Sequence, residues 1–167
     1  PISRQPYGEV LSGLFYGYFI PMITLYINMP LGTYLTYDFS FEKITLNINV
    51  IPFVTVAFLG LLPFCATANI MLANNICDLE KDITVKRYTL PFYLGSKSLG
   101  LFAAIYYLTY LAACAMVVFK ILPPITLLYL LTIIPVQKNI NTFFKKQEKS
   151  ETFIVSVKNY IIIMGTM

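Results

Sequence analysis

The chain contains no histidine, and only 12% of its 167 residues carry a charge. The absence of histidine excludes an imidazole general base, a histidine-ligated haem and zinc sites of the Cys/His type. Soluble domains usually contain about 25% charged residues, so a chain with half that density cannot cover its surface with groups that face water. With hydrophobic residues at 57%, this composition excludes a soluble or disordered protein and indicates a polytopic helical membrane protein.

Cysteine is also scarce, and Cys65, Cys77 and Cys114 have no C-x-x-C spacing. Two of them lie in apolar runs, so we interpret all three as small packing residues and exclude a disulfide framework. The net charge of +4 is more typical of membrane topology than of nucleic-acid binding, and we expect no nucleic-acid partner. No signal-peptide pattern opens the chain, so we expect no cleaved leader.

Long apolar runs dominate the rest of the chain. A helix needs about 20 mainly apolar residues to cross a bilayer. Five segments approach this requirement: 10–29, 48–73, 99–119, 121–136 and 153–167. We expect Pro52 and Pro63 to kink the second segment, and the third and fourth to form a tight helical hairpin. The prediction is an all-α, polytopic transmembrane bundle of about five spans, with residues 1–167 in one transmembrane domain.

The basic residues indicate how these spans are oriented. Nine of the 12 Lys and Arg residues fall on the side of the N-terminal tail: Arg4, Lys81, Lys86, Arg87, Lys97, Lys138, Lys145, Lys146 and Lys149. The opposite side has only Lys43 and Lys120, and Lys158 lies within the last segment. Because positive charge accumulates in cytoplasmic loops, we expect a multi-pass protein of the plasma membrane whose richly charged loops are cytoplasmic.

The acidic residues concentrate after the second span. Asn74, Asp78 and Asp82 are spaced four residues apart. If the helix continues past the membrane surface, they project from one side of it, with neighbouring Cβ atoms about 5–6 Å apart. Two carboxylates at that separation can hold Mg²⁺ when a phosphate supplies further oxygen ligands. We therefore predict a Mg²⁺ site at Asn74, Asp78 and Asp82, with Asp78 and Asp82 as the catalytic residues.

Lys86 and Arg87 follow one helical turn later and are suited to neutralising a diphosphate. This set of residues suits departure of diphosphate from an apolar substrate, which requires no nucleophilic side chain. The 13 Tyr and 13 Phe residues offer π-faces for the carbocation that remains. The alternative is that the charges only fix the topology and that the aromatic residues face lipid.

Residues 74–82 and 86–91 resemble the second aspartate-rich motif of the UbiA superfamily of intramembrane prenyltransferases. The resemblance is closest to the 1,4-dihydroxy-2-naphthoate polyprenyltransferases of menaquinone biosynthesis. Residues 1–9 and the pair Lys158 and Asn159 are similar as well. The resemblance therefore extends along essentially the whole chain, although only residues 74–95 are specific.

The resemblance implies about nine helices around a cavity, with two aspartate-rich motifs at its cytoplasmic mouth. In such an enzyme Mg²⁺ bridges these motifs to a polyprenyl diphosphate, and an aromatic acceptor attacks the allylic cation. By position, Asn74, Asp78 and Asp82 correspond to the metal site. Lys86 and Arg87 correspond to diphosphate contacts, and Tyr88 and Arg4 approach the acceptor or the diphosphate.

The first aspartate-rich motif of that family, N-D-x-x-D-x-x-x-D, is absent from this sequence. We therefore expect the C-terminal half of the enzyme, inactive without the N-terminal half. Three other acceptors remain open: 4-hydroxybenzoate, homogentisate and haem. A non-enzymatic transporter or scaffold is a further alternative. Transporters place ionisable groups near the bilayer midplane, whereas the acids here lie at the end of a span, which favours the enzyme.

Overall fold

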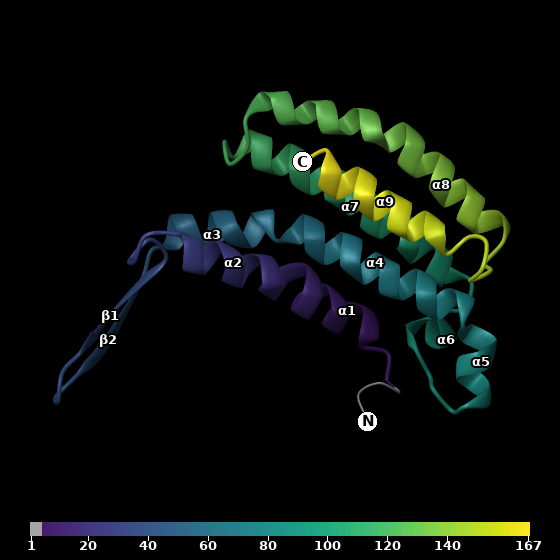
Figure 1. Cartoon of the computed structure of the whole chain (residues 1–167), viewed down its shortest axis with the longest axis horizontal. Helices are drawn as coiled ribbons and strands as arrows, with labels where there is room; N and C mark the ends of the chain where they lie inside the picture. Colours follow the sequence, from purple (N-terminus) through teal and green to yellow (C-terminus); the bar gives the residue numbers. More distant parts are fainter. Residues whose placement is uncertain (1–4) are drawn as a thin grey trace.

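The computed structural model describes residues 5–167, which form long helices lying side by side and one β-hairpin (Figure 1). The helical elements are α1 (Gly8–Ser12), η2 (Gly13–Phe19), α2 (Ile20–Asn28), α3 (Val50–Leu59), α4 (Leu61–Cys77), α5 (Leu79–Thr84), α6 (Leu90–Leu94), α7 (Lys97–Val118), η3 (Pro124–Thr132), α8 (Ile133–Lys145) and α9 (Ile154–Gly165). The hairpin consists of β1 (Leu35–Phe39) and β2 (Ile44–Ile48). The predicted helical membrane bundle is confirmed, and the hairpin was not anticipated.

The first long helix runs through α1, η2 and α2 without a break and widens into π-helical turns at η2. Pro21 follows this stretch, and it explains the widening. A proline in a helix donates no N–H and clashes with the carbonyl four residues earlier, which here belongs to Gly17. Wider turns relieve that clash while the chain stays helical.

The second long helix is divided at Gly60 into α3 and α4. Pro63 explains the division, because its ring conflicts with the carbonyl of Leu59, the last residue of α3. Pro52 lies in the first turn of α3, where a missing N–H costs nothing. The expected kink is therefore present at Pro63, and the expected kink at Pro52 is wrong.

Within residues 5–167, three helices are long and apolar enough to cross a membrane: Gly8–Asn28, Val50–Cys77 and Lys97–Val118. The fourth expected span begins as the 3-10 helix η3 and continues into α8, whose residues after Val136 are largely polar. The fifth corresponds to α9, an apolar helix of 12 residues.

The core lies where α4, α7, α8 and α9 meet. Phe102 of α7 and Phe143 of α8 are fully buried, with ring centroids 4.6 Å apart. The expected hairpin of the third and fourth spans is present, because α7 packs against η3. Thr109 and Tyr129 share a buried hydrogen bond of 2.9 Å between these helices.

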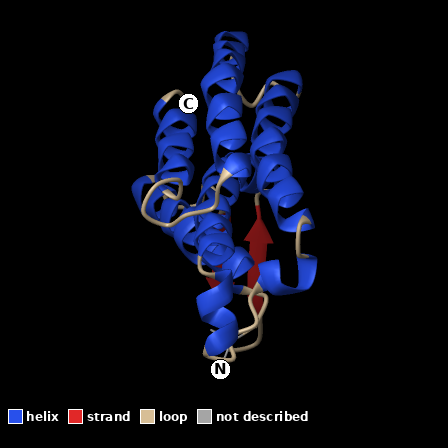
Figure 2. Cartoon of the chain, turned by 90° about the vertical axis from the view of Figure 1, so that its right-hand side faces the viewer, coloured by secondary structure: helices blue, strands red, loops and turns tan. Residues whose placement is uncertain are grey.

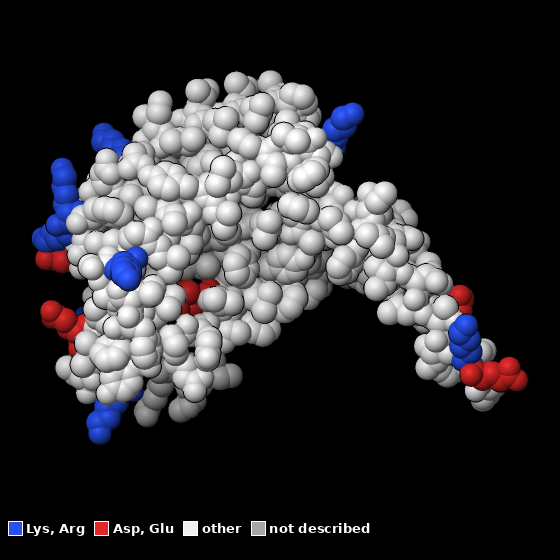
Figure 3. Space-filling view, turned by 180° about the vertical axis from the view of Figure 1, so that it is seen from behind, with Lys and Arg blue, Asp and Glu red and all other residues white. Residues whose placement is uncertain are grey.

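The charged segments gather at one end of the bundle. The start of α1, the helices α5 and α6, and the loop between α8 and α9 lie there, and the hairpin projects from the opposite end (Figure 1). Figure 2 views the bundle from the end with α5 and α6, and the strands lie behind the helices. Charged side chains appear at this end and at the hairpin tip, with little charge on the surface between them (Figure 3). Among the described residues, which exclude Arg4, the two groups of basic residues expected from the sequence thus lie at opposite ends.

Candidate functional site

The aspartate-rich segment is not one continuous helix. Helix α4 ends at Cys77, Asp78 forms the junction with φ −95° and ψ 6°, and α5 begins at Leu79. An aspartate is unfavourable at the C-terminal end of a helix and favourable at an N-terminal end, so a junction suits this residue. The expectation that Asn74, Asp78 and Asp82 project from one side of a single helix is therefore wrong.

The end of α5 turns the chain back onto Asp82. Lys86 adopts a left-handed conformation with φ 56°. The backbone N–H of Lys86 donates to the carbonyl of Ile83 at 3.0 Å, and that of Arg87 donates to the carbonyl of Asp82 at 2.8 Å. These two bonds form a Schellman motif. The motif brings the Arg87 side chain over the carboxylate of Asp82.

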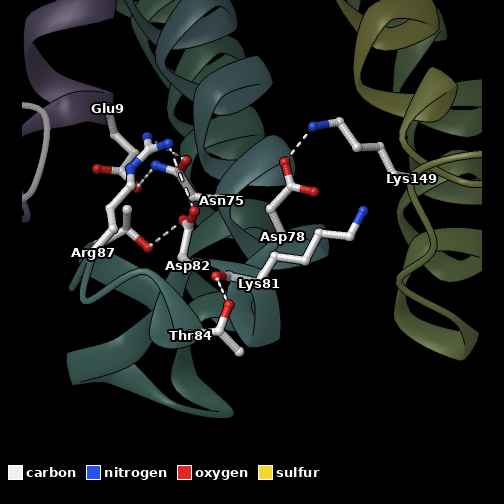
Figure 4. A network of polar contacts seen from close by, with 9 residues as sticks. Glu9, Asn75, Asp78, Lys81, Asp82, Thr84, Arg87 and Lys149 are labelled. Atoms are coloured by element: carbon white, nitrogen blue, oxygen red, sulfur yellow. Dashed lines mark hydrogen bonds and ion pairs between the residues drawn. The ribbon is translucent and has the colours of Figure 1, made fainter.

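A polar network built on Asp82 joins three parts of the chain (Figure 4). Arg87 Nη1 lies 3.6 Å from Asp82 Oδ1, and Arg87 Nη2 donates to Asn75 Oδ1 at 3.4 Å. Asn75 Nδ2 donates to Glu9 Oε1 at 2.8 Å, which connects α4 to α1. The hydroxyl of Thr89, at the start of α6, donates to Asp82 Oδ2 at 3.4 Å. We call these five residues the Asp82 network.

Two atoms of the Asp82 network are buried without a hydrogen-bond partner among the described residues, Glu9 Oε2 and Arg87 Nε. Glu9 itself is only 3% exposed. A buried polar atom without a partner costs about 1–3 kcal/mol, so such atoms are uncommon in cores and are found at binding sites. The network therefore has unused capacity for both a cation, at the carboxylate, and an anion, at the guanidinium.

Asp78 belongs to a second contact, on the other side of the α4–α5 junction. Its carboxylate forms an ion pair with Lys149 from the loop between α8 and α9, and it points away from Asp82 (Figure 4).

The same loop contains a second group of ion pairs, in which Lys146 pairs with Glu148 at 3.0 Å and with Glu151 at 2.9 Å. Its hydrogen bonds to Glu151, the larger contribution, and to Glu148 raise the pKa of its ammonium group. A pocket of about 650 Å³ opens between this loop and the junction.

The remaining predicted residues are placed as follows. Asn74 lies in the last turn of α4, one turn before the junction at Asp78. Its neighbour Asn75, and not Asn74 itself, belongs to the Asp82 network. Lys86 is exposed at the turn. The ring of Tyr88 lies 4.7 Å from that of Phe92, centroid to centroid. Arg4 lies outside the described residues.

The acidic side chains at this end can be compared with the ligands that a divalent metal requires. Among residues 5–167, no three His, Cys, Asp or Glu side chains are grouped so that they could hold a metal ion. The carboxylate of Asp82 and the oxygen of Glu9 that has no partner among residues 5–167 are nevertheless the hard oxygen donors that Mg²⁺ prefers, and Asp78 offers another on the far side of the junction. The chemistry of the donors therefore fits Mg²⁺, with the remaining ligands supplied by a substrate.

Sequence reasoning missed Glu9, Asn75, Thr89 and Lys149. For Glu9 a signal was present, because an acid at the start of an apolar span is costly and often functional. Asn75 and Thr89 adjoin residues that were selected. For Lys149 no local signal exists, since it lies 71 positions from Asp78 and meets it only through the fold.

Comparison with known families decides what kind of protein carries this site. The UbiA prenyltransferase family matches residues 1–156. The chain belongs to the UbiA prenyltransferase family. No curated protein and no solved structure gave a match.

Membership of the UbiA family identifies a membrane prenyltransferase. Members of the family use a prenyl diphosphate and an aromatic acceptor and generally depend on a divalent metal. The family therefore supports the enzyme over the transporter and scaffold alternatives. The polar end of this UbiA chain has a carboxylate oxygen and a guanidinium nitrogen without partners among residues 5–167, and groups of this kind can bind a charged diphosphate head.

Proposed function

We propose that this UbiA chain binds the diphosphate of a polyprenyl diphosphate at the Asp82 network and assists transfer of the prenyl group to 1,4-dihydroxy-2-naphthoate, in menaquinone biosynthesis. The observation that carries the proposal is the largely buried Glu9–Asn75–Arg87–Asp82 chain, two of whose atoms have no partner among residues 5–167. The proposal includes, from the resemblance, that the family's first aspartate-rich motif, which is absent from these 167 residues, completes the site in the full enzyme. It also places this end of the bundle in the cytoplasm.

In this proposal each residue has a distinct part. From the resemblance, Asn74, Asp78 and Asp82 would hold Mg²⁺, which would neutralise the negative charge that develops on the leaving diphosphate. Because Asp78 pairs with Lys149 and points away from Asp82, it would have to leave that ion pair to share an ion with Asp82. Arg87, whose Nε has no partner among residues 5–167, donates to diphosphate oxygens, and the exposed Lys86 adds a mobile positive charge. Asn75 keeps Arg87 oriented by accepting its hydrogen bond. Tyr88 and Arg4 are assigned to the acceptor or the diphosphate.

Activity measurements on variants test these roles. The chain is expressed in membranes, alone and together with a family member's segment that carries the first aspartate-rich motif. Prenyl transfer to 1,4-dihydroxy-2-naphthoate is then measured with and without a chelator. We expect Asp82→Ala and Asp78→Ala to lower the rate about 10²–10³-fold, as loss of one charge-stabilising group does. Glu80→Ala is the matched control, because Glu80 is an exposed acid of the same segment.

Equal rates for Asp82→Ala and Glu80→Ala would refute the metal role of Asp82. Activity that survives the chelator would refute the metal altogether. Parallel assays with 4-hydroxybenzoate, homogentisate and haem test the acceptor assignment separately from the diphosphate site. Prenylation of one of these in place of the naphthoate would overturn the acceptor assignment and leave the diphosphate site intact.

A further inference from the structure

The β1–β2 hairpin has one apolar face and one polar face. Side chains of directly paired residues in an antiparallel ladder project from the same face, and successive pairs alternate between faces. One face carries the pairs Leu35–Ile48, Tyr37–Leu46 and Phe39–Ile44. The other carries Thr36–Asn47 and Asp38–Thr45. The first face is therefore entirely apolar and the second entirely polar.

The apolar face is uncovered by the described chain. Tyr37 and Phe39 are each 73% exposed, Ile44 is 69% exposed and Leu46 is 59% exposed. An isolated two-stranded hairpin is at best marginally stable in water and needs its hydrophobic face covered. The exposed apolar face therefore requires an apolar environment.

The flanking helices indicate which environment covers it. The hairpin joins α2 to α3, and neither helix has a buried residue among those described. Both belong to helices long and apolar enough to cross a membrane, so we take their exposed apolar surface as the lipid-facing one. Leu35 and Tyr37 line one hollow together with Tyr26 and Ile27 of α2. The apolar face of the hairpin is thus continuous with the lipid-facing surface of α2.

Asn49 fixes the hairpin to the membrane end of these helices. It is the only residue between β2 and α3. Its side chain donates to the carbonyls of Gly32 at 2.7 Å and Thr33 at 3.1 Å, and its backbone N–H donates to the carbonyl of Tyr34 at 2.9 Å. The ring of Tyr34 stacks on that of Tyr26, with centroids 6.1 Å apart. Tyrosines are enriched where a membrane meets water, which is the depth that this base would occupy.

We propose that the hairpin is an interfacial membrane anchor. It lies along the bilayer surface, with Tyr37, Phe39, Ile44 and Leu46 in the acyl-chain boundary and the polar face toward water. It does so on the membrane side opposite the Asp82 network, because it leaves the other end of the bundle (Figure 1). Asp38, Glu42 and Lys43, near its tip, then remain hydrated among the headgroups. This inference is independent of the proposed reaction.

The absence of tryptophan permits a direct test with single-tryptophan variants. Tyr37→Trp probes the apolar face, and Thr45→Trp is the matched control on the polar face. The full protein is reconstituted in phosphatidylcholine vesicles with brominated acyl chains, and in plain vesicles with iodide on both sides. We expect bromine to quench the Tyr37→Trp emission several-fold more than that of Thr45→Trp, and iodide to show the reverse order.

Leu46→Trp, at the position paired with Tyr37, repeats the test if Tyr37→Trp fails to fold, as judged by circular dichroism. Two results would overturn the proposal. Strong iodide quenching on both faces would mean that the hairpin extends into water. Protection of the apolar face from both iodide and bromine would mean that another polypeptide, or a second copy of the chain, covers it.

Discussion

Close contact between the first two long helices depends on Gly17, and replacing it with alanine should force them apart. A Cβ at Gly17 would lie 2.4 Å from the carbonyl oxygen of Pro63 and 2.8 Å from the Cα of Phe64. Ordinary contacts between such atoms are about 3.5–4.0 Å. Because the obstructing atoms belong to the backbone of α4, no side-chain rotation can relieve the clash. Gly13, four residues earlier, makes a similar approach to Phe64, which completes a small-x-x-x-small contact.

The free-energy cost of the clash at Gly17 can be isolated by comparison with Gly100, a glycine of α7. At Gly100, in α7, a Cβ would have no neighbouring atom within 4 Å among the described residues, so alanine there meets open space. Both substitutions gain about 1 kcal/mol of helix propensity. The difference between Gly17→Ala and Gly100→Ala therefore isolates the clash, about 1–3 kcal/mol for overpacking. Gly60→Ala should cost less, because its Cβ would meet the ring of Tyr18, which can turn away.

Unfolding free energies of the three variants, measured in lipid bicelles with a denaturing detergent, check this order. Equal stability of Gly17→Ala and Gly100→Ala would show that the helices do not approach as described. Gly17→Ala should also reduce prenyl transfer, because Glu9 lies on the same helix and reaches Asn75 only while that helix stays against α4.

Two further predictions concern residues that join separate segments at the polar end. Glu9→Ala should lower prenyl transfer about 10–100-fold, as loss of a supporting partner does, and Glu9→Gln should recover only part of it, because its amide oxygen still accepts from Asn75 but the second carboxylate oxygen is lost; full activity of Glu9→Ala would contradict this. Lys149→Met should lower stability by about 1–3 kcal/mol, since it leaves the carboxylate of Asp78, whose side chain is only 15% exposed, without its partner; it should also lower the Mg²⁺ concentration for half-maximal rate by freeing Asp78. A rate that falls at every Mg²⁺ concentration would instead make Lys149 a substrate contact.

The long helices and the distribution of charge could be predicted from the composition of each segment. Apolar runs located the long helices, and the alternation of basic loops placed the charged segments at opposite ends. The hairpin was missed although residues 35–48 alternate apolar and polar on both strands. Its strands have five residues each, so a search for runs of about 20 apolar residues treats them as a loop.

The geometry of the site was harder to anticipate, for two physical reasons. The return of Arg87 to Asp82 requires a left-handed residue after α5, and a lysine occupies that position where glycine is the usual signal. The contact between Glu9 and Asn75 spans 66 positions and exists only because glycines let two helices touch. Residue types at a spacing of four drew attention to the segment 74–82, but tertiary packing selects which of its side chains meet.

The hydrogen bonds at the polar end depend on the packing of the apolar helices. Glu9, Asn75 and Arg87 come from three segments: α1, α4 and the turn after α5. Each hydrogen bond between them requires the two segments that it joins to keep their relative positions. The helices are held by close backbone contact at Gly13 and Gly17, within apolar surface. A prenyl diphosphate has the same division, with a charged head and an apolar chain. If the head binds at the Asp82 network as proposed, the prenyl chain can stay beside the apolar helices, and any substitution that separates the helices should weaken binding of the head as well.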